Sequence, residues 1–93
     1  MWLNVQLHTD FAYVASLTLS KLGKLINQNV PVIASILKHA DGEFYVHSVV
    51  VYRIEEDIIH LLDPEDGEKG LGIDLFERLW QHNDYTAIVI EKR

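Results

Sequence analysis

Hydrophobic and polar residues alternate most regularly between His47 and Asp63, in the stretch HSVVVYRIEEDIIHLLD. This alternation predicts two apolar strands that fold back on one another through Glu55, Glu56 and Asp57. Side chains of a strand point to opposite faces in turn. The two faces of the first strand are then His47, Val49, Val51 and Arg53 on one side and Ser48, Val50 and Tyr52 on the other.

The length of the turn decides whether the two ends of this hairpin meet. A three-residue turn pairs Ile54 with Ile58. Continued along the ladder, that register sets Val49 opposite Asp63, and His47 then lies one diagonal step from Asp63 on the same face. A two-residue turn would shift the register by one and send Asp63 to the opposite face. The pairing of imidazole and carboxylate therefore depends on the turn.

The residues before this hairpin predict a strand, a helix and an interior strand. Leu3–His8 alternates and predicts a short strand, whereas Asp10–Ser16 suits either a helix or a strand. A helix capped by Thr18 or Ser20 is expected to run to about Asn29. Its apolar stripe consists of Leu19, Leu22, Leu25 and Ile26.

The remaining segments are predicted from apolar runs and turn residues. Val32–Lys38 is apolar on both faces and predicts an interior strand, followed by a hairpin turn at Asp41 and Gly42. The glycines in EDGEKGLG, after the central hairpin, predict a polar loop. Asp74 is expected to cap a short helix, and YTAIVIEK forms the last strand. The apolar side of that helix is Leu75, Phe76, Leu79 and Trp80.

These elements predict one α+β domain over residues 1–93. Hairpins dominate the order of elements, so we expect a mainly antiparallel sheet of about five strands with two short helices. Ninety-three residues are near the lower limit for a core without disulfides or metal.

Composition excludes several classes of function. Fourteen acidic residues against eight basic ones give a formal charge of -6, and no basic stripe is present, so nucleic acid is not an expected partner. No apolar run is long enough to span a bilayer, and the first ten residues lack the basic start of a secretion signal. We therefore expect a cytoplasmic protein without membrane insertion.

The polar residues do not predict a metal or a cofactor. The sequence has no cysteine, which removes thiolate ligands, disulfides and cysteine nucleophiles together. Glu65, Asp66 and Glu68 lack the ordered ligand alternation of a calcium loop. None of the histidines has a recognisable ligand spacing. These histidines are His8, His39, His47, His60 and His82.

Four segments resemble the papain-like cysteine peptidases that process bacteriocin leader peptides, the double-glycine peptidase family. The segments are VPVIASILK, HSVVVYR, IIHLLDPEDG and IDLFERLWQHNDYTAIVI, and the similarity covers roughly Ser20 to Glu91. The resemblance is to the second half of such peptidases, which implies the sheet half of a papain-like fold.

The resemblance assigns His47 to the catalytic base of the family and Asp63 to the acid that orients it. A carboxylate on the far ring nitrogen fixes the tautomer with which an imidazole removes a thiol proton. If Gln6–Ser16 is a relic of the nucleophile motif, Phe11 stands in place of the thiol and Ala12 in place of a glycine. Otherwise the catalytic lobe is missing. Under either alignment, this chain alone cannot form a thioacyl intermediate, and we expect both site residues to be vestigial.

We therefore expect a non-catalytic, peptidase-like domain that binds a peptide or protein partner. A sheet that lacks its covering lobe exposes apolar surface, and such surfaces are usually interfaces, so a homodimer or a complex with another chain is expected. The alternative is that His47 and Asp63 belong to one piece of a split cysteine peptidase whose cysteine lobe is on another chain. A third possibility is a small regulatory protein on the same scaffold, although no residue selects it.

Overall fold

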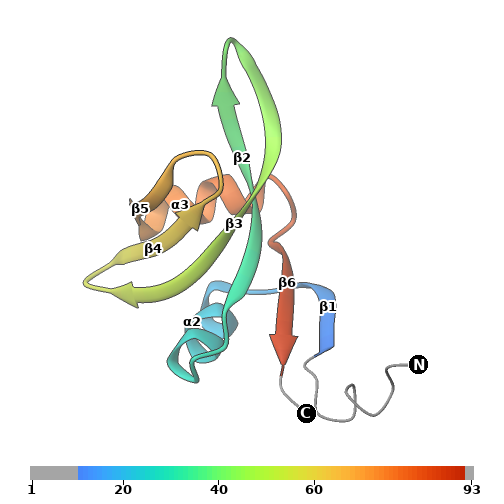
Figure 1. Ribbon diagram of the computed structural model, residues 1–93, viewed down its shortest axis with the longest axis vertical. Coiled ribbons are helices and arrows are strands. Elements are labelled where there is room, and N and C mark those ends of the chain that lie inside the picture. The colour runs from blue at the N-terminus through green and yellow to red at the C-terminus, as the bar shows by residue number, and fades with distance from the viewer. Residues whose placement is uncertain (1–10, 92–93) are drawn as a thin grey trace.

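The described chain folds into an antiparallel sheet of six strands with two helices (Figure 1). The structure is a computed structural model, and it describes residues 11–91. The strand order is β1-β6-β2-β3-β4-β5. The elements are β1 (Phe11–Ser16), α2 (Leu19–Asn27), β2 (Val32–Ala40), β3 (Glu43–Glu55), β4 (Ile58–Asp63), β5 (Gly67–Gly72), α3 (Ile73–Gln81) and β6 (Thr86–Glu91).

The predicted fold class is confirmed, with corrections to the strands. The sheet is mainly antiparallel and carries two helices, but it has six strands rather than about five. The ambiguous segment ending at Ser16 is a strand, β1, which pairs with β6 along the outer edge of the sheet. The strand predicted at Leu3–His8 lies outside the described residues.

Helix α2 begins and ends where its residues predict. The Thr18 hydroxyl accepts a hydrogen bond from the Lys21 N–H at 3.0 Å, which satisfies one of the free donors of the first turn. Asn29 follows the helix with a φ of 61°, the left-handed conformation that asparagine tolerates. The buried stripe of the helix is Leu22, Leu25 and Ile26.

Helix α3 is capped differently from the prediction. Gly72, not Asp74, holds the capping position, and no side chain caps the helix there. Asp74 lies in the first turn, where a carboxylate favours the positive end of the helix dipole. The Ile73 N–H donates instead to the backbone oxygen of Asp57 at 2.9 Å. The start of α3 is therefore fastened to the turn of the central hairpin.

The prediction of a loop over EDGEKGLG is wrong in its second part, because Gly67–Gly72 form the edge strand β5. This strand pairs along the whole of β4, from Asp63 opposite Gly67 to Ile58 opposite Gly72. Its three glycines hide the alternation on which a strand prediction depends. Gly70 packs closely against Ile58, since a Cβ at this position would approach Ile58 Cγ2 to 3.0 Å.

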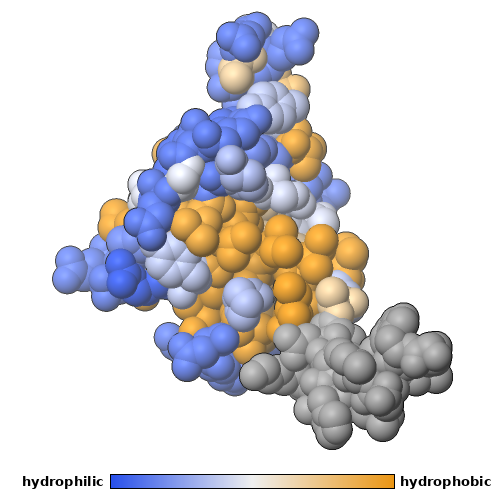
Figure 2. All heavy atoms as spheres, in the orientation of Figure 1, coloured by the Kyte–Doolittle hydropathy of each residue, from blue (hydrophilic) through white to orange (hydrophobic). Residues whose placement is uncertain are grey.

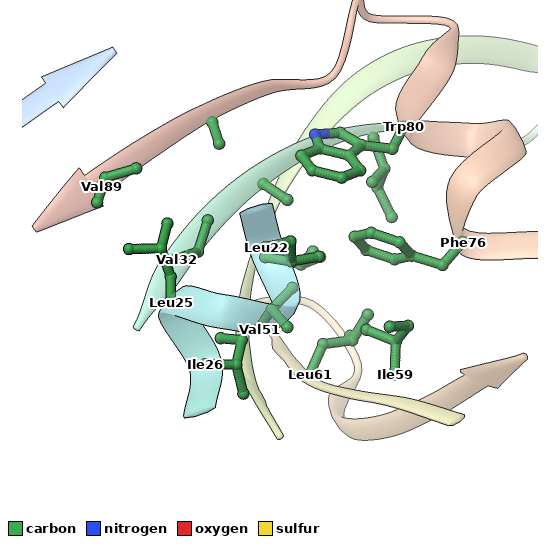
Figure 3. Close-up of a cluster of buried hydrophobic side chains, with 14 residues drawn as sticks. Leu22, Leu25, Ile26, Val32, Val51, Ile59, Leu61, Phe76, Trp80 and Val89 are labelled. Carbon is green, nitrogen blue, oxygen red and sulfur yellow. The ribbon is translucent and has the colours of Figure 1, made fainter. Parts of the chain in front are cut away.

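One face of the sheet, the inner face, is covered by the two helices. Phe76 and Trp80 of α3 are fully buried against the sheet, together with the stripe of α2 (Figure 3). The Trp80 ring nitrogen donates to the backbone oxygen of Thr86 at 2.9 Å, so this large ring is buried without an unpaired donor. The sheet residues in this core are Val32, Ala34, Ile36, Val49, Val51, Ile59, Leu61, Ala87 and Val89.

The turn of the central hairpin has two residues instead of three. Glu55 pairs with Ile58, and the turn residues Glu56 and Asp57 have φ values of 55° and 63°. Two positive φ values are typical of the tight turn that matches strand twist. The expected pairing of Ile54 with Ile58 is therefore wrong.

A β-bulge restores the expected register at the far end of this hairpin. The ladder shifts between Val51 and Arg53, which leaves Tyr52 as the extra residue. Beyond the bulge, Val50 pairs with Leu62. One step further, this register sets Val49 opposite Asp63, as the three-residue turn would have done. Arg53 does not share the face of His47, because Ile54 packs against the core in its place.

The other face of the sheet, the outer face, carries a row of apolar side chains. Cross-strand pairing joins the row residue by residue over five strands. Val14 is 71% exposed at one end and Leu62 is 43% exposed at the other. Figure 2 shows hydrophobic residues gathered over the middle of this view. The row consists of Val14, Ile88, Ile33, Val50 and Leu62.

Candidate functional site at the His47 and Asp63 end of the sheet

The structure brings together the two residues that the sequence singled out. His47 lies on β3 and Asp63 is the last residue of β4, and His47 Nε2 is 2.7 Å from Asp63 Oδ1. Their side chains are 11% and 4% exposed. The pairing that depended on the turn is therefore present, because the bulge at Tyr52 compensates for the shorter turn.

This contact fixes the tautomer of the histidine. An ionised carboxylate only accepts hydrogen bonds, so Nε2 must carry the proton in the contact with Asp63. In the neutral ring the other nitrogen, Nδ1, is then a hydrogen-bond acceptor. Within residues 11–91, no hydrogen bond to His47 Nδ1 is found. Asp63 therefore orients the ring through Nε2, whereas Nδ1 has no hydrogen-bond partner among residues 11–91.

Asp63 is held as an anion by its donors. Burial raises the pKa of this carboxyl group, but His47, the Glu65 N–H and Lys38 all donate to it, and their hydrogen bonds hold its pKa well below the usual range. The Glu65 N–H lies 2.8 Å from Oδ1 and Lys38 Nζ lies 3.0 Å from Oδ2. The Asp66 N–H approaches Oδ1 at 3.3 Å. This carboxylate therefore orders the turn that follows β4 as well as the imidazole.

Lys38, like Asp63, binds several residues of the site at once. Its ammonium also donates to Glu65 Oε1 at 2.8 Å and to Asp66 Oδ2 at 2.9 Å. The hydrogen bonds to Glu65 and Asp66 raise the pKa of Lys38 well above its usual range, against the opposing effect of burial. The hydrogen bond from Lys38 is also the largest cause that lowers the pKa of Glu65 and the pKa of Asp66. Lys38 is thus a permanent cation.

Tyr45 completes the cluster from strand β3. Its hydroxyl donates to Glu65 Oε1 at 2.9 Å, and this hydrogen bond is the main cause that raises the pKa of Tyr45. The ring of Tyr45 meets the His47 ring edge-on, with centroids 6.0 Å apart. Tyr45 therefore supports both the imidazole and the acidic turn.

The cluster offers an oriented base without a nucleophile. The sequence has no thiol. The Lys38 ammonium has no free electron pair while it is protonated, and the Tyr45 phenol donates its proton to Glu65. Among the described residues, no hydroxyl is hydrogen-bonded to the His47 ring. The described residues therefore form an oriented imidazole that has no hydrogen-bonded nucleophile beside it.

The cluster has the donor spacing of a metal site but already contains a cation. His47, Asp63 and Glu65 place one ligand atom each within 4.8 Å of one another. The Lys38 ammonium lies within 3.0 Å of both Asp63 and Glu65, so a metal ion would have to displace it. We assign no metal to these residues. The other histidines of the described chain lie elsewhere, and His39, for example, stacks on Phe44.

Most of the residues that surround the pair are not predicted from the sequence. Glu65 and Asp66 stand out there only as candidate calcium ligands, and Tyr45 has no signal of its own. Lys38 had a usable signal, because it continues the inward-facing alternation of Val32, Ala34 and Ile36. A lysine in phase with buried residues predicts a partner of opposite charge on a neighbouring strand.

Comparison with known proteins places these residues in a family. The family model described as Peptidase C39 family matches residues 7–93. The chain belongs to the peptidase C39 family. This confirms the resemblance to bacteriocin-processing cysteine peptidases, and the match begins earlier than the Ser20 expected from the four segments. No curated protein and no solved structure matches the chain.

Membership in the peptidase C39 family shows which residue type the sequence lacks. The family resemblance assigns the base and its orienting acid to His47 and Asp63, but the sequence lacks the cysteine that the base would deprotonate. Phe11, which one alignment placed at the thiol position, begins strand β1 and not a helix. In the described part of the chain, no helix is both long and apolar enough to cross a membrane.

Proposed function

We propose that this member of the peptidase C39 family is a non-catalytic domain that binds a protein or peptide partner. The observation that carries the proposal is the apolar row on the outer face of the sheet, which residues 11–91 leave exposed at Val14 and Leu62. The lack of a cysteine in a chain that retains the His47–Asp63 pair supports it, because the scaffold is kept while the nucleophile is absent.

The outer face has the character of an interface rather than of ordinary surface. Single exposed apolar residues are common, but a contiguous apolar patch on a soluble domain is typical of a binding site. Phe44 and Val46 extend the face along the distal part of the β2–β3 hairpin and are 67% and 58% exposed. This distal part protrudes beyond the rest of the sheet (Figure 1).

A second copy of the chain is the partner that the row fits best. The five residues of the row are all uncharged and aliphatic, so the row does not select a partner by charge. Two such rows are self-complementary about a two-fold axis, which is the commonest symmetry of protein dimers. Sheets that stack face to face bury both rows at about 10 Å separation.

The test places a charge in the row and measures mass in solution. Leu62→Lys adds a lysine at an exposed position of the row, whereas Gln81→Lys adds one at the exposed end of α3. We expect light scattering to give about twice the monomer mass for the wild type and for Gln81→Lys, and the monomer mass for Leu62→Lys. A wild-type chain that stays monomeric at high concentration and captures no partner would refute the proposal.

The second candidate function is one piece of a split cysteine peptidase. The 2.7 Å contact between His47 Nε2 and Asp63 favours it, because a carboxylate on one ring nitrogen orients the imidazole as a base requires. The test mixes this chain with a separately encoded chain that carries a glutamine and a cysteine before a helix. Thiol-dependent peptide cleavage that is lost in His47→Ala would support this function. If the mixture cleaves no peptide, whether it contains the wild type or His47→Ala, this function is excluded.

A further inference from the structure

We propose that the outer edge of strand β5 binds an extended peptide segment of a partner protein, which adds to the sheet as a further antiparallel strand. β5 pairs with β4 on one side, and among residues 11–91 no strand pairs with its other side (Figure 1). The main chain of such an edge presents N–H and C=O groups that another extended chain can satisfy. The inference does not depend on what covers the outer face.

The main chain of β5 is open to solvent. Its three glycines are exposed, and because a glycine has no side chain, the exposed atoms are main-chain atoms. Helix α3 starts directly after β5 and crosses the inner face, where the Trp80 ring donates to the backbone oxygen of Thr86 on β6. Because β6 lies beyond β2 in the sheet, the helix runs away from the edge.

The edge is regular and held in place at its start. Natural edge strands are commonly blocked by a proline or by a β-bulge. β5 contains no proline and pairs with β4 along its whole length without a register shift. Asp63 accepts hydrogen bonds from the N–H groups of Glu65 and Asp66, which orders the turn before the strand. An edge that is already ordered binds a peptide at a lower cost in conformational entropy.

The side chains of β5 determine which peptide fits. Lys69 and Leu71 lie on the inner face, because their partners on β4 are buried. An acidic peptide residue suits the position opposite Lys69, and an aliphatic one suits the position opposite Leu71. On the outer face Gly70 has no side chain, so an aromatic peptide residue lies over it, against Ile58. In antiparallel order the fitting segment is therefore aliphatic, aromatic, acidic.

A second copy of β5 does not have this pattern. When two copies pair antiparallel, residues on the same face stand opposite one another. A pair centred on Lys69 sets two lysines opposite each other, which is destabilising. A pair centred on Gly70 sets Lys69 opposite Leu71, and one centred on Leu71 overlaps only from Gly70 to Gly72. The partner that fits is therefore a different chain.

The experiment titrates the ¹⁵N-labelled protein with the capped peptide acetyl-Thr-Val-Tyr-Glu-Lys-Thr-amide and follows the glycine amides by NMR. Gly23 lies on α2 and Gly42 in the turn between β2 and β3, so these two glycines are internal controls. We expect saturable shifts of the β5 glycines, with a Kd of about 1 mM or below, and unchanged signals from both controls. Amides of β5 that face away from β4 should exchange with solvent at least about tenfold more slowly in the complex.

Two matched changes test the main-chain and side-chain parts of the recognition. N-methyl groups on the valine and tyrosine nitrogens of the peptide keep every side chain. One of two neighbouring residues in a strand directs its N–H toward β5, so this peptide should bind at least about tenfold more weakly. Lys69→Glu should weaken the original peptide about fivefold, and lysine in place of the peptide's glutamate should restore the affinity.

The opposite results overturn the inference. They are unchanged β5 glycines at about 5 mM peptide, equal binding of the N-methylated peptide, and shifts of the β5 glycines on raising the protein concentration alone, which would show pairing with a second copy. If Lys69→Glu does not fold, the N-methylated peptide decides on the wild type. None of these results depends on the mass in solution, so the proposed function is tested separately.

Discussion

At the scale of single residues, Asp63 connects the parts of the site. Its carboxylate accepts hydrogen bonds from an imidazole, an ammonium group and two backbone N–H groups, although its side chain is only 4% exposed. A buried carboxylate is costly unless such donors surround it. Orientation of His47 is therefore built into the folding of the chain and is maintained whether or not a nucleophile is supplied.

The depressed pKa of Asp63 makes a prediction for acid stability. Because the folded state binds this proton less readily than the unfolded state, the stabilisation is fully present above the ordinary value of about 3.9. It is lost as pH falls through the lower pKa of the folded state. We expect the Tm of the wild type to fall below about pH 4. Asp63→Asn should have a lower Tm at pH 7 and a shallower fall in acid.

Thermal melts from pH 7 to pH 2 measure this difference. Glu65 and Asp66 also have lowered pKa values, so a part of the acid slope should remain in Asp63→Asn. Glu43→Gln is the control, since Glu43 is exposed on the same strand as His47. An acid slope in Asp63→Asn equal to that of the wild type would show that Asp63 does not carry the effect.

At the scale of elements, local signals predicted what local forces determine. The cap at Thr18, the end at Asn29 and the Asp41–Gly42 turn were all read from single residues, and each is formed as predicted. Strand β5 was missed because edge strands can form from any extended segment that finds a partner. The helix start at Gly72 was missed because its partner, the Asp57 oxygen, comes from another element.

The candidate site was predictable only in part, for a reason of register. Alternation placed His47 on the same face as Val49 and Val51, and its contact with Asp63 required a particular number of residues between them. The turn is shorter than predicted and the strand contains one residue more than regular pairing needs, so the two deviations cancel. Neither deviation has a sequence signal of its own. The correct pairing followed from an incorrect turn.

The bulge makes a prediction about deletions in β3. Removing Tyr52 leaves Val51 opposite Leu61 and Arg53 opposite His60, so the whole ladder can close without the extra residue. We expect this variant to fold, with the free energy of unfolding lowered by less than about 1 kcal/mol. Its ¹⁵N spectrum should still show His47 bonded through Nε2.

Deletion of Val50 is the matched control on the other side of the bulge. It forces either Tyr52 into the core or His47 to the outer face, so we expect a loss of more than about 3 kcal/mol. Urea denaturation of the two variants measures both values. Equal destabilisation by the two deletions would show that Tyr52 is not the residue that sets the register.

At the scale of the whole molecule, the two faces of the sheet carry different kinds of residues. The inner face contains the packed core and the polar cluster around His47. The outer face contains the apolar row. The row and strand β5 share no residue, so the two proposals can be separated by mutation.

Net charge makes the last prediction, which distinguishes a second copy from a basic partner. Each chain has a formal charge of -6, so two copies repel one another at low ionic strength even though their apolar rows attract. Salt screens that repulsion over about 10 Å at 0.1 M and strengthens the burial of apolar surface. We therefore expect the proposed dimer to tighten when NaCl is raised from about 0.02 M to 0.5 M.

Sedimentation equilibrium measures this change in dimer affinity. Gln81→Lys lowers the repulsion without changing the row, so this variant should dimerise at a lower salt concentration. A complex with a basic protein would weaken over the same range of salt. The sign of the salt effect therefore distinguishes a second copy of the chain from a basic partner.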